Sequence, residues 1–247
     1  MLTDQQVAEA ARALHQAELD NVPITPISVT YPDADVEDAN RISTAVTGLK
    51  VNAGRIVKGH KIGLTSKAMR SLTGATEPDY GTMFDNWFVL EGSAVPRSTM
   101  NRPLVEVELA FVLRDALSGP GVNAADVIRA TDFVLPCIEI VDTRQQGRGV
   151  VVLGGRPAKL TDLDIRRVGA TLSINGTVEE SGVASAVMGN PINAVAWLAN
   201  MLHHYGVTPE AGHVILSGSF IKAIPFEPGD TVVAMFDSLG EVTFSAV

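Results

Sequence analysis

Cysteine is nearly absent from this chain, since Cys137 is the one cysteine among 247 residues. One thiol cannot form an internal disulfide, so the sequence excludes a disulfide-rich secreted scaffold and fits a reducing compartment. The sequence also lacks histidine and cysteine residues at the spacing of a zinc site. We expect Cys137 to behave as a small buried apolar side chain.

A surplus of positive charge is missing as well. Lys and Arg number 19 against 28 Asp and Glu, which gives a formal net charge of -9. The basic footprint of a nucleic-acid-binding protein is therefore excluded, and no glycine-rich phosphate motif indicates a nucleotide. No apolar run approaches the roughly 20 residues of a membrane span, and the first residues do not resemble a signal peptide. We expect a soluble cytoplasmic protein without a membrane partner.

Helical patterns gather at the N-terminus. Thr3 and Gln6 have the spacing of a capping box before one periodic segment. Asp35 precedes a second periodic segment, which we expect to end at Gly54. The sequence therefore predicts an N-terminal helical region at residues 1–54.

The remaining residues, 55–247, alternate between short apolar segments and turn residues. Their composition predicts a turn at 77–81 and a hairpin at Asn175-Gly176. One long helix is expected after Asn190, because proline follows this capping residue. The mixture indicates an α+β fold whose β-rich domain carries the candidate catalytic residues.

Residues 104–113 read as a strand with two acids set into an apolar run. Side chains two positions apart share a face of a strand, so Glu106 and Glu108 point the same way, and Val107 and Leu109 point the other way. Two adjacent carboxylates repel in a poorly solvated place, and a cation or shared protons would relieve that repulsion. The segment alone fits either an edge strand with solvated glutamates or a functional site.

A third acid, Glu139, lies within another apolar strand expected at residues 133–141. A buried glutamate is unusual unless it is paired. Three carboxylates from two strands suggest one shared cation, and a set of oxygen ligands alone favours Mg²⁺ or Mn²⁺ over Zn²⁺. Such a site would keep coordination positions open for a 2-oxo acid and a water molecule.

Three further candidates have an ordinary structural interpretation beside the functional one. Lys61 lies in a glycine-flanked strand and could donate a proton or stabilise an oxyanion, but it could also point to water. Asp79 could act as a general base or form an Asx turn. Residues 217–220 offer hydroxyls and backbone N–H groups for a carboxylate, or form a plain polar loop.

Several segments, in the same order along the chain, resemble one known family. They are Lys58–Met69, Glu77–Gly81, Val105–Phe111, Pro136–Glu139, Gly154–Pro157, Asn190–Asn200 and Ser217–Phe220. Together they are similar to the family of 2-keto-4-pentenoate and 2-oxohept-4-ene-1,7-dioate hydratases, in the fumarylacetoacetate hydrolase superfamily. The resemblance spans nearly the whole chain.

The resemblance implies a role for each candidate residue. Glu106, Glu108 and Glu139 would be the ligands of a divalent metal, Mg²⁺ or Mn²⁺. Lys61 and Asp79 would be the acid–base residues. Ser219 and His60 would lie near the carboxylate or oxo end of the substrate. The fold implied is a mixed β-roll core with an N-terminal helical region, assembled into a homo-oligomer, with a pentamer or a decamer as candidates.

The activity implied is metal-dependent addition of water to a 2-hydroxy-dienoate or 2-oxo-alkenoate during aromatic meta-cleavage catabolism. Decarboxylation of 4-oxalocrotonate is the alternative within the same family, and the aspartate of the 77–81 segment favours hydration. C–C hydrolysis of an acylpyruvate is typical of more distant superfamily members. A protein of another class, which binds oxo acids without turnover, is a further alternative.

One departure from the family pattern concerns the connection at residues 145–149. The resemblance implies roughly twenty further residues there, including polar residues near the site. Either the loop is trimmed or a lid segment is missing from the sequence, and we favour the second interpretation. The basic partner for a second substrate carboxylate is open, with Arg70, Arg144 and Arg148 as candidates.

Overall fold

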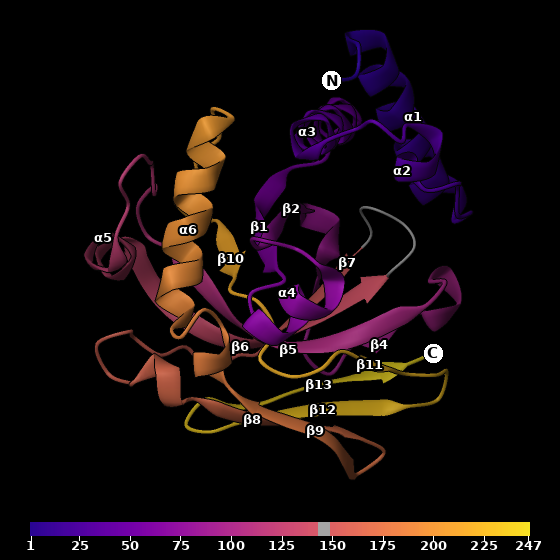
Figure 1. Ribbon diagram of the computed structural model, residues 1–247. Coiled ribbons are helices and arrows are strands. Elements are labelled where there is room, and N and C mark those ends of the chain that lie inside the picture. Colours follow the sequence, from indigo (N-terminus) through magenta and orange to yellow (C-terminus); the bar gives the residue numbers. More distant parts are fainter. Residues whose placement is uncertain (143–148) are drawn as a thin grey trace.

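The computed structural model describes residues 1–142 and 149–247, and it contains two β-sheets with helices around them (Figure 1). The larger sheet has eight strands in the order β2-β1-β10-β5-β6-β7-β3, with β11 paired to β5. The smaller sheet has five strands in the order β4-β13-β12-β8-β9. Sequence neighbours are often not sheet neighbours, which is typical of a mixed α+β fold.

The helices and strands have the following bounds. The helices are α1 (Asp4–Asp20), α2 (Ile27–Thr30), α3 (Val36–Asn52), α4 (Lys67–Thr73), α5 (Ala124–Ala130) and α6 (Pro191–His204). The strands of the larger sheet are β1 (Val57–Gly63), β2 (Asp79–Phe84), β3 (Phe88–Leu90), β5 (Pro103–Leu113), β6 (Thr131–Asp142), β7 (Gly149–Leu153), β10 (Val214–Leu216) and β11 (Ile224–Pro225). The strands of the smaller sheet are β4 (Ala94–Val95), β8 (Gly169–Ile174), β9 (Thr177–Val183), β12 (Thr231–Phe236) and β13 (Gly240–Ala246).

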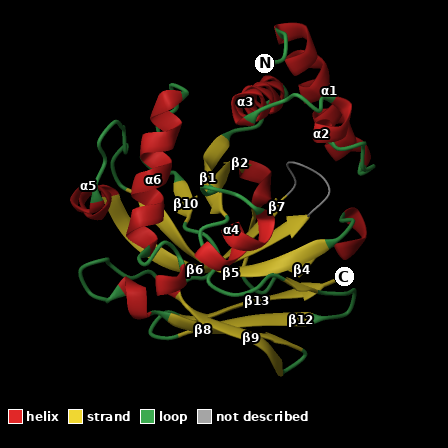
Figure 2. Ribbon diagram, in the orientation of Figure 1, coloured by secondary structure: helices red, strands yellow, loops and turns green. Residues whose placement is uncertain are grey.

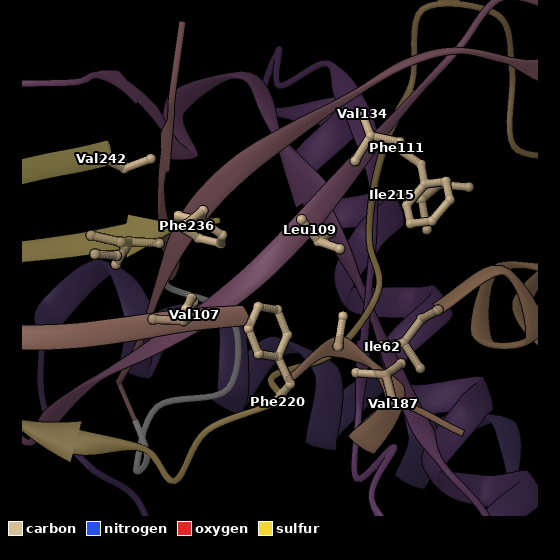
Figure 3. Packing of buried hydrophobic residues seen from close by; sticks show 14 of the residues in the cluster. Ile62, Val107, Leu109, Phe111, Val134, Val187, Ile215, Phe220, Phe236 and Val242 are labelled. Atoms are coloured by element: carbon tan, nitrogen blue, oxygen red, sulfur yellow. The ribbon is translucent and has the colours of Figure 1, made fainter. Parts of the chain in front are cut away.

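The main hydrophobic core lies between the two sheets and beneath α6. Figure 3 shows Val107, Leu109 and Phe111 of β5 pointing into it, together with Phe236 of the smaller sheet. These three β5 side chains are fully buried, as the alternation of residues 104–113 predicts. The opposite face of β5 therefore turns Glu106 and Glu108 away from the main core.

A second, smaller apolar cluster covers that opposite face of the larger sheet. Its buried members are Met83, Phe84, Trp87, Ala110, Cys137, Val151, Val214 and Leu216. Cys137 is buried and free, as expected. Burial, followed by the charges of Glu108 and Glu139, raises the pKa of its thiol well above the ordinary value.

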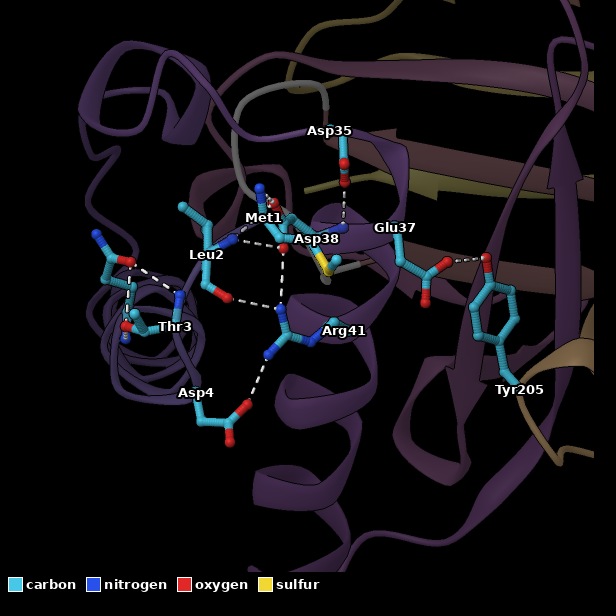
Figure 4. A network of polar contacts seen from close by, with 10 residues as sticks. Met1, Leu2, Thr3, Asp4, Asp35, Glu37, Asp38, Arg41 and Tyr205 are labelled. Carbon is cyan, nitrogen blue, oxygen red and sulfur yellow. Dashed lines mark hydrogen bonds and ion pairs between the residues drawn. The ribbon is translucent and has the colours of Figure 1, made fainter.

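The N-terminal helices form a separate layer, at the upper right of Figure 1. Helices α1 and α3 pack on each other through a small apolar cluster of their own, which includes Val7, Ala10 and Ile42. The buried Asp38 carboxylate accepts the Leu2 N–H at 2.9 Å and pairs with Arg41 at 3.0 Å (Figure 4). These contacts attach the start of the chain to α3.

A buried ion pair also joins α1 to α3. Lys50 Nζ lies 2.6 Å from Glu18 Oε2, and it stands over the rings of Phe84 and Trp87 at 4.8 and 5.8 Å from their centroids. Since both rings belong to the cluster on the larger sheet, Lys50 connects the N-terminal layer to that sheet.

Most predicted elements are confirmed, and some are corrected. The capping box at Thr3, the hairpin at Asn175-Gly176 and the helix after Asn190 are present. The turn predicted at 77–81 is wrong from Asp79 onward, because that residue begins β2 and pairs with β1. Figure 2, coloured by secondary structure, shows the separation of the N-terminal helices from the β-rich part. No helix among the described residues has both the length and the apolar character needed to cross a membrane.

Candidate active site

Three glutamates from the two central strands converge on the face opposite the main core. Glu106 of β5 lies directly across from Glu139 of β6 in the antiparallel register, and Glu108 is two residues along β5. One carboxylate oxygen from each lies within 4.8 Å of the others. The spacing fits three ligands around one cation, because a strand pair places directly opposite side chains close together.

These carboxylates are poorly supplied with hydrogen-bond donors. Glu108 and Glu139 are fully buried, and Glu106 is partly buried. Glu108 Oε2 accepts the N–H of Gly218 at 2.7 Å. Its Oε1 atom, and both carboxylate oxygens of Glu139, have no hydrogen-bond partner among the described residues. Buried carboxylate oxygens without an N–H donor are suited to bind a cation, since a cation would supply the missing interaction.

The buried carboxylates of the cluster repel one another. Burial, and then the negative charge of Glu139, raises the pKa of Glu106 to about 7 even though Lys61 opposes the shift. Burial, followed by the charges of Glu139 and Glu106, raises the pKa of Glu108 well above its ordinary value. Part of the cluster therefore tends to hold protons near neutral pH unless positive charge compensates it.

Lys61 of β1 supplies one positive charge to this site. Its Nζ atom lies 3.7 Å from Glu139 Oε2. Burial alone would lower the pKa of this ammonium, but Glu139, Glu106, Asp79 and Glu108 raise it above the ordinary lysine value. Lys61 is therefore a protonated group beside the carboxylates, suited to donating a proton or stabilising an oxyanion.

Asp79 stands at the start of β2, directly opposite Gly63 of β1. Its side chain is exposed and lines the same cavity as Lys61 and Glu139. Lys61 lies opposite Gly81 in the same strand pair. Each of these two candidate residues is therefore paired with a glycine on the neighbouring strand.

A cavity of about 900 Å³ lies between these residues and the N-terminal helices. The charged side chains of Lys61, Asp79 and Glu139 line one end of this cavity. The opposite wall is mostly apolar and comes from α1, the segment around α2, and α3. It includes Leu14, Ala17, Pro23, Ile24, Pro26, Ile27, Ala39 and Ile42. A substrate in this cavity would meet charged groups at one end and an apolar wall at the other.

The structure does not bring His60 into the carboxylate cluster. His60 alternates with Lys61 along β1, so the two side chains point to opposite faces of the sheet. The His60 ring is buried on the core face with its centroid 6.1 Å from that of His213, and neither ring nitrogen has a hydrogen-bond partner among the described residues. The substrate role that the resemblance assigns to His60 stays a prediction.

Ser219 lies one residue after Gly218, which donates to Glu108. Its hydroxyl is engaged within its own turn, since it donates to the Ile221 carbonyl at 3.0 Å and accepts the Ile221 N–H at 3.3 Å. A contact of Ser219 with substrate would require this hydroxyl to exchange partners, and its role also stays a prediction.

Of the candidate cations for a second substrate carboxylate, Arg70 is the one that the structure describes. Arg70 donates to the carbonyls of Leu64 and Thr65, both at 2.9 Å, and does not line the cavity. Arg144 and Arg148, and most of the shortened connection, lie outside the described residues. Lys61 is the one lysine or arginine among the described residues that line the cavity.

Sequence reasoning missed two parts of this site. The first is the apolar wall from the N-terminal helices, because amphipathic periodicity shows which side of a helix is buried but not what it faces. The second is Gly63, whose position opposite Asp79 follows from a strand pairing that the predicted turn concealed. The glycines flanking Lys61 were the available signal.

The chain is similar in sequence to several known hydratases. The chain is 42% identical to a 2-oxo-hept-4-ene-1,7-dioate hydratase from Escherichia coli, over 94% of this chain and 95% of that protein. It is 36% identical to a 2-keto-4-pentenoate hydratase from Paraburkholderia xenovorans, over 98% and 95% of the two chains. The 2-hydroxyhexa-2,4-dienoate hydratase of Comamonas testosteroni is 35% identical. No protein-family model matches the chain.

Solved structures of other enzymes have the same fold as this chain. A 4-oxalocrotonate decarboxylase from Pseudomonas putida G7, complexed with magnesium and adipate, superposes with a TM-score of 0.96 at 32% identity, and the alignment covers 100% of this chain and 99% of that one. A fumarylpyruvate hydrolase from Pseudomonas aeruginosa, complexed with Mn²⁺ and pyruvate, has a TM-score of 0.63 at 15% identity, over 78% and 89% of the chains, which shows the shared fold alone. The predicted β-roll fold class is thereby confirmed.

The relatives include both hydratases and decarboxylases, which are all lyases. The similarity extends over nearly the full length of this chain and of its relatives. The chain therefore belongs to the family of 2-keto-4-pentenoate and 2-oxo-hept-4-ene-1,7-dioate hydratases, within the fumarylacetoacetate hydrolase superfamily.

Proposed function

We propose that this protein is a divalent-metal-dependent hydratase that acts on a 2-oxo-alkenoate or its 2-hydroxy-dienoate form. The convergence of three carboxylates with Lys61 and Asp79 at one end of the cavity carries the proposal. As substrate we propose 2-oxo-hept-4-ene-1,7-dioate, the compound that appears in the name of the relative with 42% identity.

Glu106, Glu108 and Glu139 would hold the ion, Mg²⁺ or Mn²⁺. Their donor set contains only oxygen atoms, and several of those atoms are buried without a hydrogen-bond partner among the described residues, so the residues fit a hard divalent cation. When bound, such an ion supplies Lewis-acid polarisation of the oxygens of a 2-oxo acid.

Lys61 and Asp79 would move the protons of the reaction. In the hydroxy-dienoate, the proton of the 2-hydroxyl is lost and a proton is gained at C5, which leaves a double bond between C3 and C4 conjugated with the 2-oxo group. Lys61, a protonated group at this site, would stabilise negative charge on the 2-oxygen and assist this transfer.

Addition of water completes the proposed reaction. Asp79 would accept a proton from the attacking water while the oxygen of that water bonds to C4. C3 then takes up a proton to give a 4-hydroxy-2-oxo acid. The apolar wall of the cavity would limit the number of water molecules that reach the double bond. Removing Asp79 should therefore reduce turnover more than substrate binding.

Decarboxylation is the second candidate reaction, because a 4-oxalocrotonate decarboxylase superposes with a TM-score of 0.96. Both reactions would begin by stabilising negative charge on the 2-oxygen. The higher identity to a hydratase, at 42% against 35% for a decarboxylase relative, favours hydration.

A turnover panel with Mg²⁺ tests the proposal. The substrates are 2-oxohept-4-ene-1,7-dioate, 2-hydroxypenta-2,4-dienoate and 4-oxalocrotonate, and the readouts are loss of dienol absorbance and release of carbon dioxide. We expect hydration of the seven-carbon diacid, and loss of turnover in Glu106→Gln and Lys61→Ala. Glu179→Gln, an exposed glutamate of β9, serves as the matched control.

The panel also separates the alternatives. Release of carbon dioxide from 4-oxalocrotonate without hydration would identify a decarboxylase. Oxalate or pyruvate binding without turnover of any dienoate would identify a binding protein. Full activity after removal of divalent metal would exclude the proposed chemistry.

The oligomeric state and the cellular location of the protein also belong to this proposal. We infer from the family resemblance a homo-oligomer, with a pentamer or a decamer as candidates, which sedimentation would measure. We also propose a cytoplasmic location, because a single cysteine fits a reducing compartment, and cell fractionation would test it.

A further inference from the structure

Gly63 occupies an unusual position beside Asp79. The two residues are directly opposite in the β1–β2 pair. A Cβ atom added at Gly63 would lie 2.0 Å from Asp79 Oδ1, 3.0 Å from its Cγ and 3.4 Å from its Oδ2. The carboxylate of Asp79 therefore occupies the space that any side chain at position 63 would need.

The backbone does not explain why a glycine stands here. Gly63 is absent from the described glycines that have a positive φ, so its conformation is available to other residues. The three nearest atoms to an added Cβ all belong to the Asp79 carboxylate. The contact that excludes a side chain at this position is thus with the end of a flexible acid rather than with the main chain.

Gly81, the other glycine of this pair, is different. An added Cβ there would lie 3.5 Å from Lys61 Cγ, an ordinary van der Waals distance. Position 81 could accept a methyl group without moving Lys61, whereas position 63 could not accept one without moving Asp79. The two glycines are therefore not equivalent in their effect on the site.

Apart from its electrostatic attraction to the Lys61 ammonium, Asp79 has few contacts that hold its side chain in the cavity. It is exposed, and its carboxylate accepts no hydrogen bond from another described residue. An exposed aspartate can adopt several rotamers. The open space over Gly63 lets the carboxylate lie across β1, on the face that Lys61 shares two residues away.

We propose that Gly63 is a positioning residue for Asp79, and that its missing side chain provides the space in which the Asp79 carboxylate lies beside the cavity. The inference rests on the proposed role of Asp79 as the base for the attacking water. A methyl group at position 63 would displace the carboxylate toward solvent without rearranging the metal-binding glutamates, which lie on β5 and β6.

The test is a double-mutant cycle on the full-length protein loaded with Mn²⁺. The variants are Gly63→Ala, Asp79→Ala and both together, with Gly169→Ala as the control. Gly169 is also a strand glycine without positive φ, and a Cβ there would meet only Gly182 O at 3.8 Å. The measurements are kcat and KM for hydration, Mn²⁺ affinity by titration, and the melting temperature.

We expect Gly63→Ala to lower kcat by roughly tenfold to hundredfold, because a catalytic group displaced by about 1 Å can lose that much. KM and Mn²⁺ affinity should change by less than about threefold, since the glutamates are untouched. In the Asp79→Ala background the same substitution should change kcat by less than about twofold, because no carboxylate remains to be displaced.

Other outcomes would overturn the inference. Full kcat in Gly63→Ala would show that Asp79 does not need this space. Equal losses in both backgrounds would show that Gly63 acts independently of Asp79. If Gly63→Ala is unstable, its melting temperature should recover in the double variant when the clash is with Asp79, and a failure to recover also contradicts the inference.

The cycle separates this inference from the proposed function. Undiminished kcat in Asp79→Ala would refute the role of Asp79 itself, and the inference would fall with it. A large loss in Asp79→Ala together with full activity in Gly63→Ala would refute only the role of Gly63.

Discussion

Glu108 is a fully buried carboxylate within a cluster of like charge, and one of its oxygens has no hydrogen-bond partner among the described residues. Without metal, each added negative charge in this cluster opposes folding, because burial and its neighbours disfavour the ionised form. With metal in the proposed site, the same carboxylate would become a ligand. Removing it should therefore have opposite effects in the two states.

We expect Glu108→Gln to raise the melting temperature of the protein in EDTA. A gain of about 1 kcal/mol would appear as a shift of about 2–4 °C for a chain of this size. The same variant should lose most of the stabilisation that Mn²⁺ gives the wild type, since one ligand is missing. Thermal unfolding with and without Mn²⁺ measures both effects, and Glu179→Gln is the control. A lower melting temperature in EDTA would contradict the explanation.

His60 predicts a pH dependence of stability. Burial, followed by the charge of His213, lowers the pKa of His60 from 6.5 to about 4. A folded-state pKa below the unfolded value means that the unfolded chain binds the proton first, so stability is complete above about pH 6.5 and is lost as the pH falls toward about 4. Burial lowers the pKa of the neighbouring His213, while the charge of Glu210 raises it and the charge of Lys58 lowers it.

We expect His60 to cost the folded protein about 2 kcal/mol at about pH 5 relative to about pH 7. Urea unfolding of wild type and of His60→Leu at the two pH values measures the difference, and the variant should lose less stability on acidification. Equal losses in the two proteins would contradict the pKa shift. The same variant addresses the substrate role of His60, because a KM raised by about tenfold would support that role.

The sequence predicted the chemistry of individual residues better than their orientation. Glu106, Glu108 and Glu139 lie close together in the structure. The sequence predicted this from the strand alternation and the two apolar runs that contain them. His60 and Lys61 are adjacent in one strand, so their side chains point to opposite faces of the sheet, and this alternation was visible in the sequence. The resemblance assigned roles by motif and did not apply that restriction.

Among the elements, β5 and β6 were predictable because both are long apolar strands with few turn residues. Strand β2 was not, since Pro78 and Gly81 give its first residues the composition of a turn. Glycine is usually unfavourable in a strand interior. Here Gly81 lies opposite Lys61, and the pairing that makes the segment a strand is long-range.

The Lys50–Glu18 pair makes a prediction about α1 and α3. Removing the carboxylate 2.6 Å from a buried ammonium should cost about 2 kcal/mol, because a buried charge loses a close partner. We expect Glu18→Gln to lower the melting temperature by about 4–8 °C. Glu9→Gln is the matched control, since Glu9 is an exposed glutamate of the same helix. Equal melting temperatures for the two variants would show that the pair contributes little.

Across the whole molecule, the apolar residues form separate clusters. The N-terminal helices have their own small cluster, and the cavity lies between them and the larger sheet. A layer with few buried apolar residues is expected to open more readily than the main core. No local sequence pattern showed this, because the wall of the cavity is formed by segments distant in the chain.

We therefore expect amide hydrogen exchange to be faster in α1 and α3 than in β5 and β6. Oxalate with Mg²⁺, a mimic of the 2-oxo acid end of a substrate, should slow exchange in β5 and β6 but have a smaller effect on α1. A substrate analogue long enough to reach the N-terminal wall should slow exchange in α1 and α3 as well. Equal protection of all these segments by oxalate would indicate a single cooperative unit.

The cavity has one wall from the strands that hold the acids and another from α1, α2 and α3. The residues proposed to perform the chemistry and the apolar residues of the other wall thus belong to different parts of the chain. Variation in the N-terminal helices could change which compound is accepted while leaving the metal ligands, Lys61 and Asp79 intact. A chimaera that exchanges residues 1–54 with a relative should inherit the substrate preference of the donor.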